Sequence, residues 1–437
     1  MTCHQSVRVC QMSDLHYSGK NLIESEACFG HAVARAIETG AQCVVVSGDS
    51  TDHALDAHSP AFVALARNIR RLADHCPVLM LQGTYGHEPP GTLSVFRLLG
   101  GRYPVFVAET IQQVALIEGG TWVASDGWRF ETLPDGARAV FSCIPTVNKA
   151  AVAAVVGATA AAEAVGEQMA NLLAGYAPIH CAARNAGIAT AVVSHGTVSG
   201  CTTEHGVPMA GLDHEFTVGS LFAAQASAVM LGHIHRHQGW EQAGRTIAYA
   251  GSIGRFHYGE QGDKGMLIWT IGADGAGIEL DLTPARRTIE LRFAGAPDLD
   301  ELRAIAAEAQ GAYVKVSWEI GEEDRASIDR DGIEAALAGA AEINLEGRIV
   351  PVVRSRAEGI SRASTLDEKL QRWAEVADVQ AEPLRAALGE LTLHTPEAIA
   401  AAILGATDST PAPRMVEVKP TPPAEVPEEV ETLDLFG

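Results

Sequence analysis

The sequence predicts an α/β fold, and three features of its 437 residues lead to this prediction. Short apolar runs rich in β-branched residues alternate with amphipathic helical segments over the first 83 residues. Several of these runs end in aspartate or histidine, as strands do at the ligand-binding edge of an open α/β sheet. After about residue 285 the pattern changes, which indicates at least one further domain.

The N-terminal part of the chain has a strand–helix–strand–helix–strand order. Strands are expected at residues 7–14, 43–49 and 77–83, where short apolar runs end in polar residues. Residues 24–38 carry apolar side chains at helical spacing. A second helix is expected from Ser59, a cap residue followed by proline at the first helical position. This order predicts a mostly parallel sheet with helices on both faces.

Further elements are expected along the rest of the chain. Strands are predicted at 138–145, 189–196, 227–233, 245–252 and 264–271, with an alanine-rich helical stretch at 148–175. A small α+β unit is predicted from strands at 287–293, 313–320 and 343–353 and helices at 298–309 and 332–341. Short helices are expected at 364–405, where Thr365-x-x-Glu368 forms a capping box and Thr395-Pro396 a second cap. The predicted domains are a core at 1–285, a small domain at 286–358, a helical segment at 359–405 and a disordered acidic tail at 406–437.

Composition and charge limit the classes of function. A net charge of −22 and a pI of about 5.1 argue against nucleic-acid binding through a broad basic face. Bound divalent metals would add local positive charge, and part of the negative excess lies in the C-terminal tail. The chain lacks an apolar run of the ~18 residues that a membrane span needs, and its eight cysteines are spaced singly. A reducing cytoplasm without a membrane partner is therefore expected.

Five polar motifs stand at the predicted strand ends. They are Asp14-Leu15-His16, Gly48-Asp49, Gly83-Thr84-Tyr85-Gly86-His87-Glu88, Ser194-His195-Gly196 and Gly232-His233-Ile234-His235. Because alternate residues of an extended strand point to the same side, Asp14 and His16 can hold one ion, and His233 and His235 can flank a pair of ions. Nitrogen and carboxylate donors together favour manganese, iron or zinc over calcium. A single histidine would more often be an ordinary core or surface residue, but the ordered set predicts a metal site.

The ordered set resembles the signature of the calcineurin-like metallophosphoesterases, and a later segment resembles the SbcD-type DNA nucleases of that superfamily. The segment comprises Tyr249-Ala250-Gly251-Ser252-Ile253-Gly254-Arg255, Gly259-Glu260 and Lys264-Gly265, after the run AVMLGHIHRHQ. The resemblance covers about residues 5–355. It implies a two-layered sheet core flanked by helices, a small DNA-facing α+β capping domain and a helical C-terminal segment.

The resemblance also implies the ligands of two metal ions. Asp14, His16 and His235 would hold the first ion, and Asp49 would bridge to a second ion held by His195 and His233. Manganese is the expected metal, with magnesium, iron and zinc as alternatives. Asp52 is a further candidate as a ligand or as a residue supporting the ligands.

The third motif departs from the family pattern of Gly-Asn-His-Asp. This chain has Thr84 and Tyr85 before Gly86, so no asparagine ligand is present. Thr84, a backbone carbonyl or a water takes that position, or else the second ion is bound more weakly. His87 would take the role of catalytic acid, with Glu88 orienting it; Glu88 is also a possible ligand.

The expected reaction is hydrolysis of DNA, as in the processing of DNA ends during double-strand-break repair. Two ions ~3.5–4 Å apart would neutralise the phosphodiester and lower the pKa of a bridging water, whose hydroxide attacks phosphorus. His87 would protonate the departing sugar oxygen. Arg255, Arg286 and Arg287 are candidate phosphate contacts, although an ordinary solvated arginine is an equally good interpretation of each.

Two other functions stay open. The acidic pI favours a small-molecule phosphodiesterase that acts, for example, on cyclic nucleotides, whereas the additional domain opposes it. The altered third motif is also compatible with a weakly catalytic scaffold subunit. The resemblance further implies a homodimer bound to an SbcC-like coiled-coil ATPase in a heterotetramer. Leu366, Leu370 and Trp373 share a helical face that would either dock on this partner or pack on the chain's own domains.

The C-terminus carries an apolar cluster after its proline-rich tail. Leu433, Leu435 and Phe436 have no folding reason to stand in a disordered acidic segment. They resemble the pentapeptide by which bacterial DNA enzymes bind the sliding clamp, with Thr432 in place of the usual glutamine. The alternative is that the tail folds back on the protein or has no role.

Overall fold

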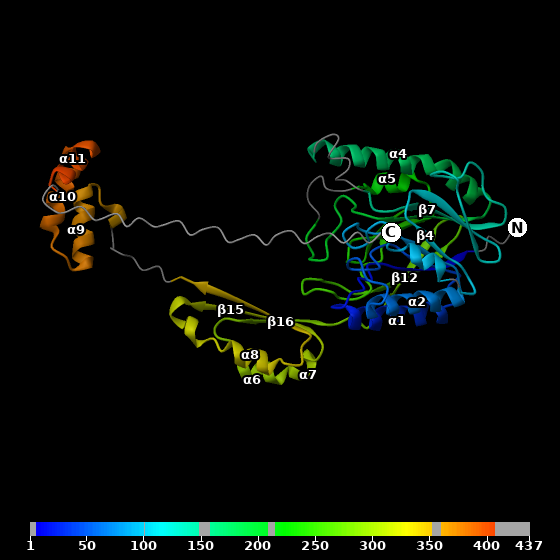
Figure 1. Ribbon diagram of the computed structural model, residues 1–437, viewed down its shortest axis with the longest axis horizontal. Coiled ribbons are helices and arrows are strands. Elements are labelled where there is room, and N and C mark those ends of the chain that lie inside the picture. The colour runs from blue at the N-terminus through cyan, green and yellow to red at the C-terminus, as the bar shows by residue number, and fades with distance from the viewer. Residues whose placement is uncertain (1–5, 100, 148–157, 209–214, 352–359, 407–437) are drawn as a thin grey trace, which may run out of the picture. The chain divides into compact units, whose positions relative to one another are not determined.

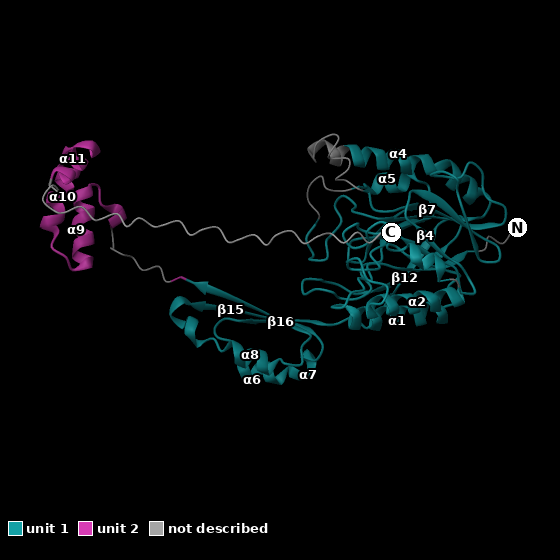
Figure 2. Cartoon of the chain, in the orientation of Figure 1, with its two compact units in different colours: residues 1–350 teal, residues 351–437 magenta. Residues whose placement is uncertain are grey.

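The N-terminal strand lies in the middle of a six-stranded sheet in the computed structural model (Figure 1). In spatial order the strands are β13 (Ala276–Leu282), β12 (Gly265–Ile271), β1 (Val7–Met12), β2 (Cys43–Val46), β3 (Val78–Leu81) and β4 (Val105–Ala108). Strands β1 to β4 pair in parallel, whereas β12 and β13 are antiparallel. The structure describes residues 6–99, 101–147, 158–208, 215–351 and 360–406. The chain divides into two compact units, Met1–Val350 and Pro351–Gly437 (Figure 2).

A second sheet of seven strands belongs to the same unit. Its order is β10 (Gln238–Gln242), β11 (Arg245–Tyr249), β9 (Ala228–Gly232), β8 (Ala189–His195), β7 (Ala137–Ile144), β5 (Gln112–Ile117) and β6 (Thr121–Ala124). The four central strands β11, β9, β8 and β7 are parallel, and the outer strands pair antiparallel.

The inner faces of the two sheets pack against each other. Val45 of β2 and Val193 of β8 belong to the same buried core, while Val44 and Val46 lie in a different core on the opposite face of β2. This alternation is the two-residue period of a strand. The fold class is therefore α/β with two sheet layers. The two-layered sheet core flanked by helices, which the resemblance implied, is confirmed. Helices on both faces of a mostly parallel sheet, which the N-terminal pattern by itself predicted, are wrong, because a continuously apolar strand is buried on both faces in either arrangement.

Helices cover the outer face of each sheet. In the first, α1 (Leu22–Glu38) and α2 (Pro60–His75) enclose one core, and a short 3-10 helix, η1 (Ser94–Leu98), adds Phe96 to it. In the second, α4 (Ala158–Asn185) and α5 (Val218–Ala223) form the outer layer. The predicted start of α2 is confirmed, because the Ser59 side chain accepts a hydrogen bond from the Phe62 amide at 3.2 Å. Of the predicted stretch 148–175, residues 148–157 lie outside the described residues.

A small parallel sheet follows the two-sheet core. Its order is β14 (Thr288–Phe293), β15 (Tyr313–Gly321) and β16 (Glu342–Val350). The connecting helices are α6 (Leu299–Ala304), α7 (Ala306–Ala309), η2 (Glu322–Ser327) and α8 (Arg330–Ala336). Leu302, Val316, Trp318 and Ile333 form a core between the sheet and the helices. The single helix predicted at 298–309 is interrupted at Ile305, and α8 begins and ends earlier than predicted.

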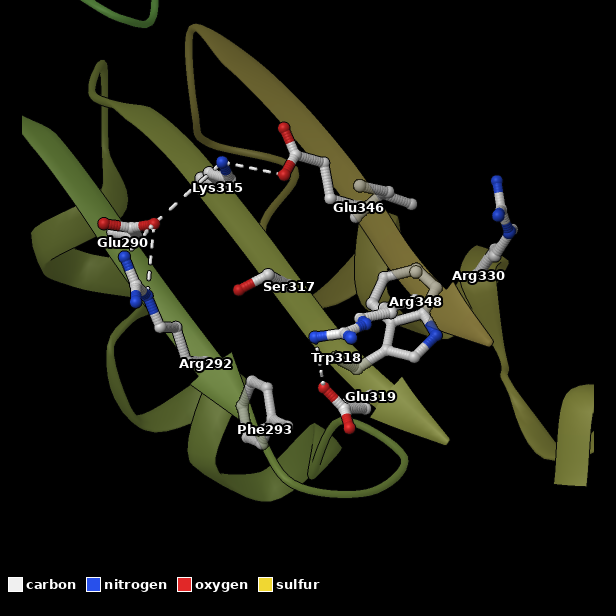
Figure 3. Close-up of a pocket in the computed structure, with 12 residues that line it drawn as sticks. Glu290, Arg292, Phe293, Lys315, Ser317, Trp318, Glu319, Arg330, Glu346 and Arg348 are labelled. Atoms are coloured by element: carbon white, nitrogen blue, oxygen red, sulfur yellow. Dashed lines mark hydrogen bonds and ion pairs between the residues drawn. The ribbon is translucent and has the colours of Figure 1, made fainter. Parts of the chain in front are cut away.

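The other face of the small sheet carries charged side chains around a shallow hollow (Figure 3). We call it the open face. It comprises Glu290, Arg292, Lys315, Ser317, Glu319, Glu346 and Arg348. Its charges pair with each other. Lys315 lies 2.8 Å from Glu346, and Arg348 lies 3.2 Å from Glu319.

The second unit holds η3 (Ile360–Arg362), α9 (Leu366–Ala377), α10 (Ala381–Leu393) and α11 (Pro396–Ala406). The predicted capping box is confirmed. Thr365 Oγ1 accepts a hydrogen bond from the Glu368 amide at 3.2 Å, and the Glu368 carboxylate accepts one from the Thr365 amide at 3.4 Å. No described helix is long and apolar enough to cross a membrane. Leu433, Leu435 and Phe436 lie outside the described residues.

Five strands were not predicted from the sequence: β4, β5, β6, β10 and β13. Strands β6 and β10 are short and mostly exposed, so they lack the apolar runs by which strands were recognised. Strand β13 alternates half-buried and exposed residues at the edge of its sheet. Strands β6, β10 and β13 each form a hairpin with a strand next to them in the chain, whereas β4 pairs with β3 and β5 pairs with β7, which lie farther away along the chain. The stability of such strands depends on this pairing more than on their own residues.

Candidate metal centre

Loops at the carboxyl ends of strands from both sheets bring six predicted ligands together. The first metal group consists of Asp14, His16 and His235, and the second of Asp49, His195 and His233. Within each group the candidate ligand atoms all lie within 4.8 Å of one another. Each group combines an aspartate from the six-stranded sheet with histidine from the seven-stranded sheet. The packing of the two sheets therefore assembles the site.

The first metal group has two imidazole nitrogens facing each other. His16 Nε2 and His235 Nε2 are 2.9 Å apart, and His235 Nε2 lies 3.7 Å from Asp14 Oδ1. Asp14 is fully buried, and its carboxylate accepts hydrogen bonds from the His233 amide at 3.2 Å. The other nitrogen of His16, Nδ1, is buried without a hydrogen-bond partner among the described residues. The facing Nε2 atoms of His16 and His235 need a proton or a cation between them.

The second metal group is held by a backbone contact and a threonine. His195 Nδ1 donates to the Ser47 carbonyl oxygen at 2.8 Å, so Nε2, which lies 3.2 Å from Asp49 Oδ2, is the nitrogen that could bind a metal ion. Thr84 Oγ1 lies 3.2 Å from Asp49 Oδ2 and 3.3 Å from His195 Nε2. Thr84 thus lies where the third motif lacks asparagine, in contact with both ligands.

The backbone at the ligands is left-handed. Asp14, His16, Asp49 and His233 have φ of 51°, 44°, 51° and 97°, and they make up four of the seven described non-glycine residues with positive φ. Positive φ is strained for such residues and concentrates at functional sites. The prediction that Asp14 and His16 face the same side because they alternate along an extended strand is therefore wrong. Strand β1 ends at Met12, before both residues. His233 and His235 belong to different groups, as the resemblance implied.

Backbone hydrogen bonds and glycines fix these turns. The amides of Asp14 and His16 donate to the carbonyl oxygens of Gly48 and Asp49 at 3.0 and 3.1 Å. Gly48 has φ of 102°, and a Cβ there would lie 2.2 Å from His195 Nδ1. Only glycine lets the loop after β2 approach the histidine this closely.

The electrostatics of the site favour bound cations. Burial alone would lower the pKa of His195, but the adjacent Asp49 carboxylate outweighs burial and raises this pKa to about 10. Burial would raise the pKa of Asp49, but His195 and, more weakly, His16 hold it below its usual range. Buried carboxylates that stabilise positive charge so strongly, beside imidazole donors, fit divalent ions such as manganese, iron or zinc.

The hydrogen-bond partners of His87 and Glu88 differ from those predicted. His87 Nδ1 donates to the Asp52 carbonyl oxygen at 2.7 Å, and its ring lies 4.9 Å from that of His16. Glu88 is fully buried, and its carboxylate accepts from the amides of Ser50 at 2.5 Å and Gly83 at 2.6 Å. The expectation that Glu88 orients His87 is therefore wrong, because backbone donors hold the Glu88 carboxylate and a backbone carbonyl orients the imidazole. Burial raises the pKa of Glu88 to about 7.

Asp52 lies next to the first metal group. Its Oδ1 is 3.6 Å from His16 Nδ1, and His16, Asp52 and His87 together offer three possible ligand atoms within 4.8 Å. The Asp52 carboxylate is partly exposed, and the adjacent His16 imidazole lowers its pKa. This placement suits a residue that orients His16 or a weak additional ligand.

Glu260 supports the first metal group, a role that the sequence did not assign. Its Oε1 accepts from His235 Nδ1 at 3.0 Å, and its Oε2 lies 2.5 Å from the ammonium of Lys264. Lys264 also donates to Ser252 Oγ and to the His235 carbonyl oxygen, both at 2.7 Å. A carboxylate behind a ligating histidine fixes its tautomer and raises its basicity. The resemblance had singled out Gly259-Glu260 and Lys264-Gly265, but only the fold shows this contact.

The three candidate phosphate contacts have partners inside the chain. Arg255 donates to the carbonyl oxygens of Glu260, Gly262 and Arg286. Arg286 pairs with Glu24 at 3.3 Å and packs over Tyr313, and Arg287 donates to the Glu308 carbonyl oxygen. The contacts of Arg286 with Arg255, Glu24 and Tyr313 link the two-sheet core to the small domain, whereas the Arg287 bond lies within the small domain. Their proposed contacts with phosphate stay a prediction.

A cavity of about 370 Å³ opens at the two metal groups. Its walls include His16, Lys20, Asn21, Asp49, Asp52, His87, Glu204, His233, His235, Phe256 and His257. Ligands from both groups thus face one space together with His87. A phosphate group that entered this cavity would meet both groups at once.

No protein-family model matches this chain, and no curated protein sequence gives a significant match. Among solved structures, GAP50, the anchor in the inner membrane complex of Plasmodium, is 12% identical with a TM-score of 0.41, over 64% of this chain and 85% of that chain. A dimetal phosphatase from Danio rerio is 12% identical with a TM-score of 0.35, over 63% and 98%. A predicted phosphoesterase from Streptococcus pneumoniae is 10% identical with a TM-score of 0.23, over 64% and 94%. These similarities are too low to assign a function, which is inferred below from the residues of the site.

Proposed function

We propose that this protein is a phosphodiester hydrolase that binds two divalent ions at the carboxyl ends of its strands. The convergence of two carboxylate–histidine groups in one cavity, beside the His87 imidazole, carries this proposal. Paired ions with mixed oxygen and nitrogen ligands are a common solution for phosphate-ester hydrolysis.

The two metal groups have complementary parts in this proposal. Asp14, His16 and His235 would hold one ion, and Asp49, His195 and His233 the other. Asp49 interacts electrostatically with His16 as well as His195, which suits a carboxylate shared by both ions. When bound, the ions would neutralise the phosphodiester and lower the pKa of a water molecule. Thr84 Oγ1, in contact with Asp49 and His195, would hold Asp49 in position or complete the second group.

His87 is proposed as the acid that protonates the departing oxygen. The Asp52 carbonyl oxygen accepts a hydrogen bond from His87 Nδ1, which orients the ring and leaves Nε2 to carry the proton for transfer. His87 lines the cavity and lies beside, but outside, the two metal groups. These two features fit proton transfer better than ligation.

The proposed substrate is DNA, in the manner of an SbcD-type nuclease that processes DNA ends. The Tyr249–Arg255 segment and the motifs around Glu260 and Lys264 support this assignment through their resemblance to that family. The small parallel sheet follows the site in the chain and contacts it, because Tyr313 Oη donates to the Phe256 carbonyl oxygen at 3.2 Å. This contact would let the small domain position DNA at the cavity.

A small-molecule phosphodiesterase is the second candidate, and the charges of the small sheet favour it. The cations of the open face are paired with carboxylates, and the three candidate arginines are held by partners in the chain. A phosphate backbone would have to break these pairs, whereas a small phosphodiester would need only the cavity. A weakly catalytic scaffold subunit is the third candidate.

An assay of the manganese-loaded full chain on linear duplex DNA, plasmid and bis-p-nitrophenyl phosphate tests the proposal. Cleavage of all three substrates supports the nuclease. Cleavage of bis-p-nitrophenyl phosphate alone supports the small-molecule enzyme. No turnover of any of them contradicts both and leaves the scaffold. A cyclic-nucleotide panel refines the second outcome.

Two partners are proposed with the nuclease. The first is an SbcC-like coiled-coil ATPase that would bind a homodimer of this chain through α9, where Leu366 and Trp373 are 60% and 41% exposed. Deletion of 364–437 should abolish co-purification with the ATPase and leave the phosphodiesterase intact. The second is the DNA sliding clamp, bound by Leu433, Leu435 and Phe436. A synthetic 425–437 peptide that fails to bind the clamp at high micromolar concentration would contradict it.

A further inference from the structure

A third group of metal-binding side chains lies at the rim of the cavity. This rim cluster consists of Glu204, His205 and His257, whose candidate ligand atoms all lie within 4.8 Å of one another. It unites two chain segments more than 50 residues apart, the loop after β8 and the loop after β11. Glu204 and His257 also line the cavity of the two metal groups.

The rim cluster is close to the first metal group but separate from it. His257 Nε2 lies 3.3 Å from Glu260 Oε1, and the same oxygen accepts from His235 Nδ1 at 3.0 Å. The His257 ring is 6.2 Å from that of His235 and 5.3 Å from that of His205. Glu260 therefore stands between the two groups, and its other oxygen is held by Lys264.

The loops are shaped to keep the cluster together. The Gln261 amide donates to the Glu204 carbonyl oxygen at 2.8 Å, which ties one loop to the other. A Cβ at position 259 would lie 2.6 Å from His205 Nδ1, so Gly259 makes room for this imidazole. His205 Nε2 reaches to 3.4 Å from Glu204 Oε1. The three side chains are thus positioned before any ligand arrives.

We propose that the rim cluster binds a third divalent ion, of the borderline class and best represented by zinc. Two imidazoles and one carboxylate are a donor set that zinc uses at sites with an open coordination position. An anion is a poorer ligand, because the Glu204 carboxylate would repel it. The proposal goes beyond two-metal hydrolysis and does not depend on it.

The open position of this ion would face the cavity through Glu204 and His257. A second anionic group of a substrate, next to the phosphodiester that reacts, would be its ligand there. This role, unlike the presence of the ion, rests on the proposed function. It predicts an effect on KM rather than on kcat.

Equilibrium dialysis of the full-length apo chain against buffered free Zn²⁺, followed by elemental analysis, tests the site. The wild-type chain should hold three ions. His205→Ala and Glu204→Gln should each hold two, and His31→Ala, which removes an exposed imidazole from α1, should hold three. Cobalt substitution gives a second readout, because the wild-type minus His205→Ala difference spectrum should show one ion's d–d bands. His205 lies outside the cavity wall, so folding and the two metal groups should be unaffected.

Equal zinc content in wild type, His205→Ala and Glu204→Gln would overturn the third site. Another result distinguishes failure of the rim site from failure of the proposed function. If Asp14→Asn and Asp49→Asn leave the zinc content unchanged while His205→Ala removes one ion, the rim site stands and the two-metal centre fails. For the role of the ion, His205→Ala should raise KM for a dinucleotide with a terminal phosphate at least several-fold, with kcat and the KM for bis-p-nitrophenyl phosphate unchanged. Equal KM values for the dinucleotide would exclude the role.

Discussion

The strand-end site and the open face of the small sheet are both rich in charge, but they hold it differently. At the strand ends, Asp14 and Asp49 are 0% and 2% exposed and converge with imidazoles. On the open face, the half-buried Lys315 and the exposed Arg348 are each paired with an exposed glutamate (Figure 3). Buried carboxylates need a cation, whereas exposed pairs neutralise each other and contribute little. Burial and convergence, rather than the number of charges, therefore mark the candidate metal centre.

The largest expected effect is that of Asp49→Asn. Removal of a charge that interacts with both metal groups should lower manganese occupancy at both, and hydrolysis should fall to background. His16→Ala should remove less metal. Elemental analysis measures the occupancy, with Glu346→Gln on the open face as the matched loss of a carboxylate. Equal metal losses in Asp49→Asn and His16→Ala would indicate that Asp49 is not shared.

His87→Ala should reduce turnover by ~10²–10⁴ and keep the metal, because a general acid acts beside the ions and does not hold them. Elemental analysis and single-turnover kinetics of one preparation give both quantities. His58→Ala, an exposed imidazole in the loop before α2, is the control and should change neither. A fall in metal content in step with activity would make His87 a ligand.

Glu260→Gln should weaken the first metal group selectively. Loss of the carboxylate behind His235 should lower affinity for one ion by ~10–100-fold, the usual effect of removing such a partner. Competition with a chelator measures this affinity. Glu260→Gln alone also leaves the buried Lys264 ammonium unpaired, which destabilises the fold. The double variant Lys264→Met with Glu260→Gln removes that ammonium, so that its metal affinity reports the loss of the carboxylate. Unchanged affinity in Glu260→Gln would leave Glu260 a purely structural role.

A fourth prediction compares two buried histidines. Burial lowers the pKa of His180 to about 4, and its nitrogens bond to Ser142 and Ala224, whereas Asp49 raises that of His195 to about 10. In the unfolded state, His180 binds a proton near pH 6.5, whereas in the folded state it stays neutral down to about pH 4. The free energy of unfolding should therefore fall as the pH drops from about 6.5 to about 4. Urea unfolding of metal-free protein at pH 7 and pH 5 measures this loss. His180→Asn should reduce it. An equal loss in variant and wild type would contradict the assignment.

The smallest effect is expected on the open face. Lys315→Gln breaks an exposed pair and should change the free energy of unfolding by at most ~1 kcal/mol. Hydrolysis of bis-p-nitrophenyl phosphate should stay the same. The salt dependence of DNA cleavage by the wild type and by Lys315→Gln tests whether the open face contributes to DNA binding. A large loss of DNA cleavage alone would show that DNA breaks the pair and uses Lys315.

The sequence alone determined the local features of this protein. Strands β1, β2 and β3, the cap at Ser59 and the capping box at Thr365 depend on neighbouring residues. The six predicted ligands are another such feature, because each follows an apolar run whose end could be read from the pattern. Their grouping into two clusters is present in the structure.

Only the tertiary structure decided how these features combine. Apolar strands are buried on both faces in one sheet or in two, so the residue pattern by itself left the arrangement open, and the pairing of distant strands produced the two-sheet core that the resemblance implied. The division of His233 and His235 between the metal groups is the one that the resemblance implied, but the positive φ of His233 was not predicted from the residue pattern. Glu260 reaches His235 across 25 residues, and Glu88 serves the backbone rather than His87, because loop geometry sets these contacts. Sequence determines which residues stand at strand ends, whereas packing of distant elements determines which of them meet.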